Sequence, residues 1–332
     1  MKALALLAAL LLAGCSGWQS ALDPHSSEAA QLAGLFWFFT AVCALIWIAV
    51  VIALAMVLLR RRRTPNDAPE EEHPMAARRK TTIVTGLALS TALVLLIFGL
   101  TSFYATRGIT WYDTQTITLK VTGQQWWWQV EYQNQDASQD FITANEIHIP
   151  VGKPVTLELD AMDVIHSFWV PSLMGKKDLI PGRKNFITLK ADEPGLYRGQ
   201  CAEFCGLEHA KMAILVFAEP QDKFEAWRRH QIEAAKTPGA PERLHGMDIF
   251  VHRQCASCHS ISGTDAGGQT APDLTHFGGR ATIAAGLFHN TPDNLDRWLA
   301  NPQQFKPGSN MPQVPLSRED RAALVAYLEG LT

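Results

Sequence analysis

The chain has 332 residues, 47% of them hydrophobic, and a formal net charge of −3 at pH 7. That length allows two modest domains besides membrane segments, and the near-neutral charge gives no reason to expect a nucleic-acid partner. The six cysteines are at positions 15, 43, 201, 205, 255 and 258. All but Cys43 have a separate role in the interpretation below, so no pair remains for a structural disulfide.

The N-terminus has one lysine, a short apolar core and small residues before Cys15. This pattern is typical of a bacterial secretory signal, and Leu-Ala-Gly-Cys at 12–15 resembles the lipobox of bacterial lipoproteins. We therefore expect a lipoprotein-type signal peptide over residues 1–14, cleavage before Cys15 and lipidation of that cysteine. Ordinary signal cleavage or an uncleaved start stays open, and in each case the mature N-terminus lies outside the cytoplasm.

Two uncharged runs follow, of 31 residues at 29–59 and of 26 residues at 81–106. Each is long enough to cross a bilayer as a tilted helix. Seven basic residues lie between them, close to the two membrane ends, which places the connecting loop in the cytoplasm. Residues 15–107 thus predict an N-terminal segment with two transmembrane helices in the inner (cytoplasmic) membrane of a bacterium, with all later residues on the periplasmic side.

Beyond the second run, apolar residues alternate with polar ones, as at Ile117, Leu119 and Val121. Such alternation indicates half-buried strands. Similar stretches, separated by Gly, Pro, Asn or Asp, recur at 128–132, 146–149, 155–159, 186–189, 196–199 and 213–217. Several short strands with turn signals predict an antiparallel β-sandwich over residues 108–220.

The densest group of metal-binding side chains has C-x3-C-x3-H-x2-M spacing and consists of Cys201, Cys205, His209 and Met212. Thiolate and thioether ligands with imidazole select copper, and two thiolates four residues apart can both bridge a pair of copper ions. Another histidine is needed, and His166 is the best upstream candidate. A disulfide between the two cysteines or a Cys2His2 zinc site stays open, although neither explains Met212.

This loop, the string DVIHSFWVPSL at 163–173 and Ile-Pro-Gly-Arg at 180–183 lie in register. Together they resemble subunit II of haem–copper cytochrome c oxidases, the subunit that carries the CuA centre. The resemblance implies a cupredoxin-like Greek-key sandwich, and a magnesium ion shared with subunit I at the carboxylate of Glu203. It also implies six ligands for a binuclear copper centre: His166, Cys201, the backbone carbonyl of Glu203, Cys205, His209 and Met212.

Three adjacent tryptophans occupy positions 126–128, and they cannot all enter one core, because side chains alternate along a strand. The family has a similar string, Gly-His-Gln-Trp-Tyr-Trp, whose first tryptophan lies at the surface over the copper centre as the electron entry point. The resemblance gives this role to Trp126, with Gln124 and Trp127 in place of the usual His and Tyr. A purely structural role for Trp126, in the core or as an anchor, stays open.

Residues 221–242 end in a stretch rich in Pro and Gly and predict a linker, after which helical spacing extends over residues 243–332. This last segment contains the C-x-x-C-H motif of covalent c-type haem attachment, formed by Cys255, Cys258 and His259. The two thiols add to the haem vinyl groups, His259 binds the iron, and Met311 supplies the sixth ligand.

A zinc or redox-dithiol role for this motif is a weaker alternative, and four other side chains could compete for the iron: Met247, His252, His276 and His289. The string Ala-Pro-Asp-Leu-Thr at 271–275 and the loop around Met311 resemble a class I cytochrome c, an all-α domain. That resemblance implies that Pro272 packs near the proximal ligand.

Together these parts predict a multi-domain membrane protein in which a copper sandwich and a cytochrome c domain follow two transmembrane helices, as in caa-type oxidases. The resemblance implies that electrons pass from a soluble or membrane-bound cytochrome donor, through haem c and CuA, to a subunit I that reduces oxygen to water and pumps protons. Two alternatives stay open. One is the electron-input subunit of a nitric oxide reductase, and the other is a non-catalytic, membrane-anchored copper or redox relay protein.

Overall fold

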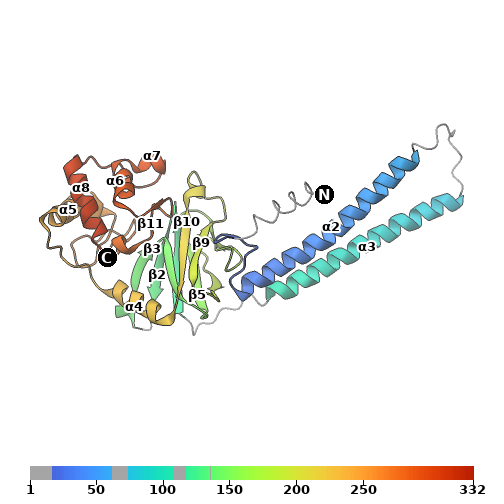
Figure 1. Ribbon diagram of the computed structural model, residues 1–332, viewed down its shortest axis with the longest axis horizontal. Coiled ribbons are helices and arrows are strands. Elements are labelled where there is room, and N and C mark those ends of the chain that lie inside the picture. The colour runs from blue at the N-terminus through green and yellow to red at the C-terminus, as the bar shows by residue number, and fades with distance from the viewer. Residues whose placement is uncertain (1–16, 62–73, 108–116, 135) are drawn as a thin grey trace, which may run out of the picture. The chain divides into compact units, whose positions relative to one another are not determined.

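The computed structural model describes residues 17–61, 74–107, 117–134 and 136–332 (Figure 1). The expected signal peptide and Cys15 lie outside these residues. The chain forms two compact units, of which one is Ala30–Thr110 and the other joins Met1–Ala29 to Trp111–Thr332.

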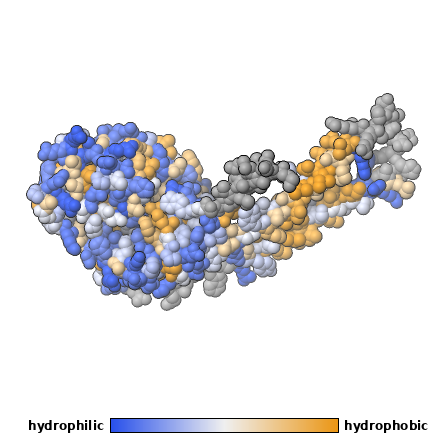
Figure 2. Space-filling view, viewed as in Figure 1, coloured by the Kyte–Doolittle hydropathy of each residue, from blue (hydrophilic) through white to orange (hydrophobic). Residues whose placement is uncertain are grey.

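The smaller unit consists of α2 (Ser27–Arg61) and α3 (Pro74–Arg107), which extend beyond the predicted spans at both ends. By length and composition both helices can cross a membrane. In each helix, the most apolar stretch of 18 residues has no residue buried inside the protein. Figure 2 shows this continuous apolar surface, which a bilayer would cover. The rings of Phe39 and Phe98 stack at 4.2 Å, so the first half of α2 lies beside the last third of α3 and the helices are antiparallel.

The larger unit contains two five-stranded sheets that face each other (Figure 1). The order of the first sheet is β3-β2-β1-β5-β8, with only the β1–β5 pair parallel. Its strands are β1 (Ile117–Gln124), β2 (Trp127–Gln133), β3 (Phe141–Ala144), β5 (Val155–Ala161) and β8 (Asn185–Leu189).

The order of the second sheet is β4-β10-β9-β6-β7, with only the β4–β10 pair parallel. Its strands are β4 (Glu146–Pro150), β6 (His166–Trp169), β7 (Lys177–Leu179), β9 (Gly195–Cys201) and β10 (Ala213–Glu219). The cupredoxin-like sandwich is therefore confirmed. All seven stretches predicted as strands lie in strands, whereas β3, β6 and β7 were not predicted.

The alternation read from the sequence explains the sandwich core. Leu119 and Val121 of β1 are fully buried, as are Trp128 and Val130 of the paired strand β2. The helix that follows the sandwich, α4 (Gln221–Ile232), packs on its outside through Trp227. The Trp227 ring stacks on the imidazole of His148 with the ring centroids 4.0 Å apart.

The C-terminal part is helical, as predicted, with one two-residue hairpin. Its elements are α5 (Pro241–His252), β11 (Thr282–Ile283), β12 (Phe288–His289), α6 (Pro292–Ala300), α7 (Pro302–Phe305) and α8 (Arg318–Glu329). Helices α5 and α8 cross where Gly246 meets Ala323, and a Cβ on Gly246 would overlap the Ala323 carbonyl. Glycine at this position therefore allows the close helix contact on which the small core depends.

Candidate functional site

The loop between β9 and β10 holds most of the predicted copper ligands. The N–H of Cys201 donates to the carbonyl of Met212 at 2.9 Å, and the N–H of Ala202 donates to that of Ser167 at 2.9 Å. Gly206, at φ +111°, takes a backbone conformation that disfavours other residues. The loop is thus held by one main-chain hydrogen bond between its two ends and another to β6, and it turns sharply at its centre.

This loop brings its sulfur and nitrogen atoms within a few ångströms of one another. The Sγ atoms of Cys201 and Cys205 lie 3.7 Å apart, far longer than the ~2.05 Å of a disulfide bond. Cys205 Sγ lies 3.6 Å from His209 Nδ1 and 3.9 Å from Met212 Sδ. Cys201 Sγ lies 3.8 Å from His166 Nδ1 and 3.2 Å from the Glu203 carbonyl oxygen. The structure therefore brings together all six predicted donor groups.

Two sulfur atoms this close cannot lose their protons independently. The contact with Cys205 is the main cause that lowers the pKa of the Cys201 thiol, and the same contact, aided by burial, raises the pKa of Cys205. A soft cation between them would compensate the charge of both thiolates. The cluster of His166, Cys201 and Cys205, whose donor atoms lie within 4.8 Å of one another, fits such an ion.

His166 is held in place by contacts on several sides. Its side chain is fully buried, and its Nε2 lies 2.8 Å from Asp163 Oδ1. Burial opposes the charged imidazolium, but hydrogen bonds with Cys201 and Asp163 outweigh it and raise the pKa of His166. A Cβ on Gly123 would lie 2.8 Å from the imidazole Cδ2. Neither Asp163 nor Gly123 was predicted as part of the site, although Asp163 lies three residues before His166.

The three tryptophans have three different environments. Trp128 is fully buried in the sandwich core, and Trp127 is half-buried. The indole N–H of Trp126 donates to the Cys205 carbonyl at 3.0 Å, as does the side-chain amide of Gln125 at 2.7 Å. Trp126 therefore lies against the metal loop as expected, but it is 7% exposed and does not lie at an open surface.

The carboxylate of Glu203 pairs with a lysine side chain at the surface. Its side chain is 44% exposed, and its Oε2 lies 3.2 Å from Lys176 Nζ. The carbonyl and the carboxylate of this residue thus face different surroundings, as the expected double role requires.

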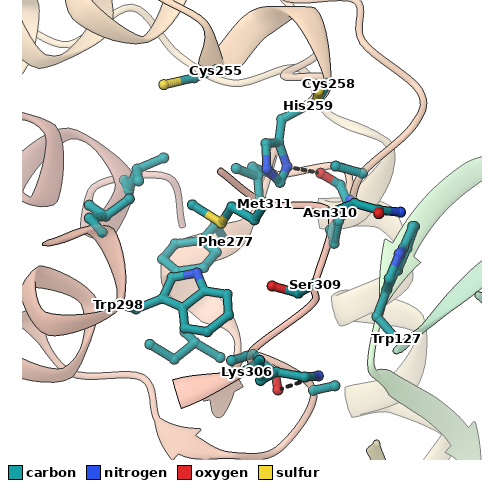
Figure 3. A pocket seen from close by; sticks show the side chains of 18 of the residues that line it. Trp127, Cys255, Cys258, His259, Phe277, Trp298, Lys306, Ser309, Asn310 and Met311 are labelled. Carbon is teal, nitrogen blue, oxygen red and sulfur yellow. Dashed lines mark hydrogen bonds between the residues drawn. The ribbon is translucent and has the colours of Figure 1, made fainter. Parts of the chain in front are cut away.

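The predicted haem-binding residues line one cavity of about 540 Å3 in the helical part (Figure 3). Cys255, Cys258, His259 and Met311 all line it, and Figure 3 shows their side chains gathered around the same space. His259 Nδ1 lies 2.7 Å from the Pro272 carbonyl oxygen, which leaves Nε2 for a metal ion. Burial lowers the pKa of His259, which keeps the imidazole neutral as a ligand must be.

The rival ligands lie elsewhere. None of Met247, His252, His276 and His289 lines this cavity. Met247 packs against the hydrophobic core of the C-terminal part, and the side chain of His252 is 72% exposed.

The cavity also fits a flat, mostly apolar group that carries carboxylates. Phe277, Leu295 and Trp298 contribute apolar surface to its lining. Arg280 also lines the cavity, is 8% exposed, and its Nε has no hydrogen-bond partner among the described residues. A buried guanidinium with a free donor suits a carboxylate such as a haem propionate.

The cavity and the sulfur cluster share a boundary. Gln125, Trp126 and Trp127, which belong to the sandwich, line the cavity together with the C-x-x-C-H motif. Because Trp126 also contacts the Cys205 carbonyl, one indole lies between the two candidate redox sites. Fold and site together define a class of protein, a membrane-anchored electron carrier with a cupredoxin-like copper domain and a c-type cytochrome domain.

Comparison with known proteins gives the family. Residues 135–219 match the family model of the cytochrome c oxidase subunit II periplasmic domain, and residues 244–332 match that of cytochrome c. The chain therefore contains a periplasmic domain of the cytochrome c oxidase subunit II family, followed by a C-terminal cytochrome c domain. These two families imply copper and haem, respectively, and the first is periplasmic by its own description.

Two relatives are both described as cytochrome c oxidase subunit 2. The one from Alkalihalophilus pseudofirmus is 42% identical over 65% of this chain and 61% of its own length. The one from Bacillus sp. PS3 is 36% identical over 66% of this chain and 63% of its own length. The chain thus spans about three fifths of the curated relatives that it matches.

Among solved structures, the periplasmic domain of subunit II of cytochrome oxidase from Bradyrhizobium japonicum is 30% identical. That match covers 37% of this chain and 96% of the other, with a TM-score of 0.34.

Proposed function

We propose that this chain is the electron-input subunit of a terminal cytochrome c oxidase, and that it carries electrons from haem c through a binuclear CuA centre to subunit I. Oxygen would be reduced on that other subunit, so the role of this chain is electron delivery. The observation that carries the proposal is the position of Trp126, which contacts the metal loop and lines the haem cavity at once.

The copper centre rests on the arrangement of its donors. Two cysteine sulfur atoms 3.7 Å apart, each with an imidazole nitrogen within 3.8 Å, suit a pair of copper ions bridged by both thiolates. Such a centre shares one electron over two metals and therefore reorganises little on reduction. We assign as its ligands His166, Cys201, the Glu203 carbonyl, Cys205, His209 and Met212.

The haem assignment rests on the cavity. Cys255 and Cys258 would attach the haem covalently, and His259 and Met311 would bind the iron. Histidine and methionine ligation gives a low-spin haem in the potential range of electron carriers. The hydrogen bond to the Pro272 carbonyl fixes the orientation of the His259 ring.

The partners and the location follow from the same assignment. Subunit I would accept the electron and share a magnesium ion with the Glu203 carboxylate, and a cytochrome would supply the electron from outside. Helices α2 and α3 would both span the inner membrane of a bacterium, with both soluble domains on the periplasmic face and Cys15 lipidated.

Electron paramagnetic resonance of the full chain, purified in detergent with copper, tests the central claim. One unpaired electron shared by two copper nuclei gives seven hyperfine lines, whereas a single copper gives four, so a four-line signal would replace the binuclear centre by a mononuclear one. Cys205→Ser should abolish the seven-line signal. Cys43→Ser, which alters an exposed cysteine of α2, is the matched control and should leave the signal unchanged.

A further inference from the structure

One charged side chain that the proposed function does not use is buried between the sandwich and the C-terminal domain. Lys306 follows α7, five residues before Met311, and is 3% exposed. Its ammonium group donates to the carbonyls of Trp126 at 2.7 Å, Lys211 at 3.0 Å and Ala284 at 3.3 Å. Lysine is almost never buried, because an ammonium group loses its hydration there. The three acceptors are what compensates for this loss.

The contact is reciprocal. Lys211, from the metal loop of the sandwich, donates from Nζ to the carbonyl of Phe305 at 2.6 Å. The same Nζ lies 2.9 Å from the carboxylate of Glu208, which is itself 3% exposed. Lys211 of the sandwich thus donates to a carbonyl of the C-terminal domain, at Phe305. The next residue, Lys306, donates in the opposite direction, to carbonyls of the sandwich.

No carboxylate accepts from Lys306 among the described residues, so the lysine depends on main-chain carbonyls alone. Burial lowers the pKa of Lys306 to about 7, while the nearby Glu208 raises it and Lys211 lowers it further. A buried ammonium of this kind adds little to stability, but it is satisfied in only one geometry. It therefore selects one relative position of the two domains.

Three more contacts cross the same interface. The N–H of Ala213, at the start of β10, donates to the Ala285 carbonyl at 3.0 Å. The N–H of Ala281 donates to Glu146 Oε2, and the guanidinium of Arg280 donates to Thr143 Oγ1, both at 3.3 Å. These bonds flank the lysine pair and offer backbone amides that report directly on docking.

We propose that Lys306 and Lys211 form a reciprocal interdomain lock that holds the C-terminal domain on the turn containing Trp126. The lock positions the loop of Met311 beside the metal loop, and it contributes no metal ligand. The docked C-terminal domain also covers the Trp126 ring, so an external cytochrome must deliver its electron to that domain and not to the copper centre. The electron route rests on the proposed function, whereas the docking of the two domains by the lysine pair does not.

Hydrogen–deuterium exchange of the full chain in detergent tests the lock. In Lys306→Met the three carbonyls lose their donor, and we expect the amides of Ala213 and Ala281 to exchange about fivefold faster than in the wild type. Lys306→Gln keeps one donor group and should give a smaller increase. Lys223→Met, an exposed lysine of α4, is the matched control and should give none.

Electron transfer from haem to copper after photoreduction gives the second readout. It should be slower in Lys306→Met and should slow further with added glycerol, because the domain must first dock, whereas the wild-type rate should not depend on viscosity. Haem and copper spectra show that each domain of a variant has folded, and Lys306→Gln carries the test if Lys306→Met fails to fold. Unchanged exchange at Ala213 and Ala281 would overturn the lock. Loss of the two-copper signal in the wild type would overturn the proposed function and leave the exchange result valid.

Discussion

Gly123 allows the ring of His166 to occupy its position, and a single methyl group tests this. A Cβ on Gly123 would lie 2.8 Å from Cδ2 and 2.9 Å from Cγ of the imidazole. That is about 0.6 Å inside ordinary van der Waals contact, and the ring is fully buried, so it cannot swing into solvent. Overpacking of this kind costs about 1–3 kcal/mol.

For Gly123→Ala we therefore expect a melting temperature lower by about 2–12 °C in the copper-free protein, since each kcal/mol is worth about 2–4 °C in a unit of this size. A displaced His166 should also change the copper spectrum. The assay is thermal unfolding by circular dichroism together with absorption spectra after copper loading. Gly239→Ala, where a Cβ meets no atom within 4 Å, is the control. An unchanged melting temperature and spectrum in Gly123→Ala would refute the argument.

The remaining predictions concern the two redox sites and one buried histidine. Met212→Leu, a near-isosteric change at a fully buried side chain, should change the copper spectrum and potential while haem content stays constant; an unaltered copper spectrum would remove Met212 from the ligands. Met311→Ala should leave the haem attached but convert it to a high-spin or ligand-exchanged form, and an unaltered low-spin spectrum would point to another ligand. Although burial of His148 favours the neutral ring, hydrogen bonds with Glu146 and Glu219 outweigh it and raise the pKa of His148. The stabilisation should be complete below about pH 6.5 and should be lost as the pH rises through the raised pKa. The free energy of unfolding should thus fall less over this range in His148→Gln than in the wild type, and parallel pH profiles would contradict this.

Most of the fold could be predicted from local patterns. The alternation in β1 and β2 and the helical spacing of the C-terminal part each depend on neighbouring residues only, and each is confirmed. The strands β3, β6 and β7 have three or four residues, too few for alternation to be distinguished from chance. β6 also begins with His166, which the sequence predicts as a metal ligand and not as part of a strand.

The metal donors could be predicted because ligand chemistry restricts both residue type and spacing. The environment of Trp126 could not be predicted in the same way. Its carbonyl accepts from Lys306, which is 180 residues away in the chain, and nothing in the local sequence around Lys306 indicates that its ammonium group is buried. In the resembled subunits the corresponding tryptophan lies at an open surface. In this chain the fused C-terminal domain lies against Trp126, and the residue is buried.

The length of the linker decides how strong the lock has to be. Eight residues, 233–240, separate α4 from α5, and even a fully flexible chain of that length would have a root-mean-square span of only about 16 Å. Such a tether keeps the domain near its docking surface at about millimolar effective concentration. An interface with a dissociation constant of about 0.1 mM would then be about nine-tenths docked. At that dissociation constant the ratio of docked to undocked domain is about ten to one, so a tenfold loss of affinity, about what one lost buried donor costs, would leave the domain undocked for about half of the time.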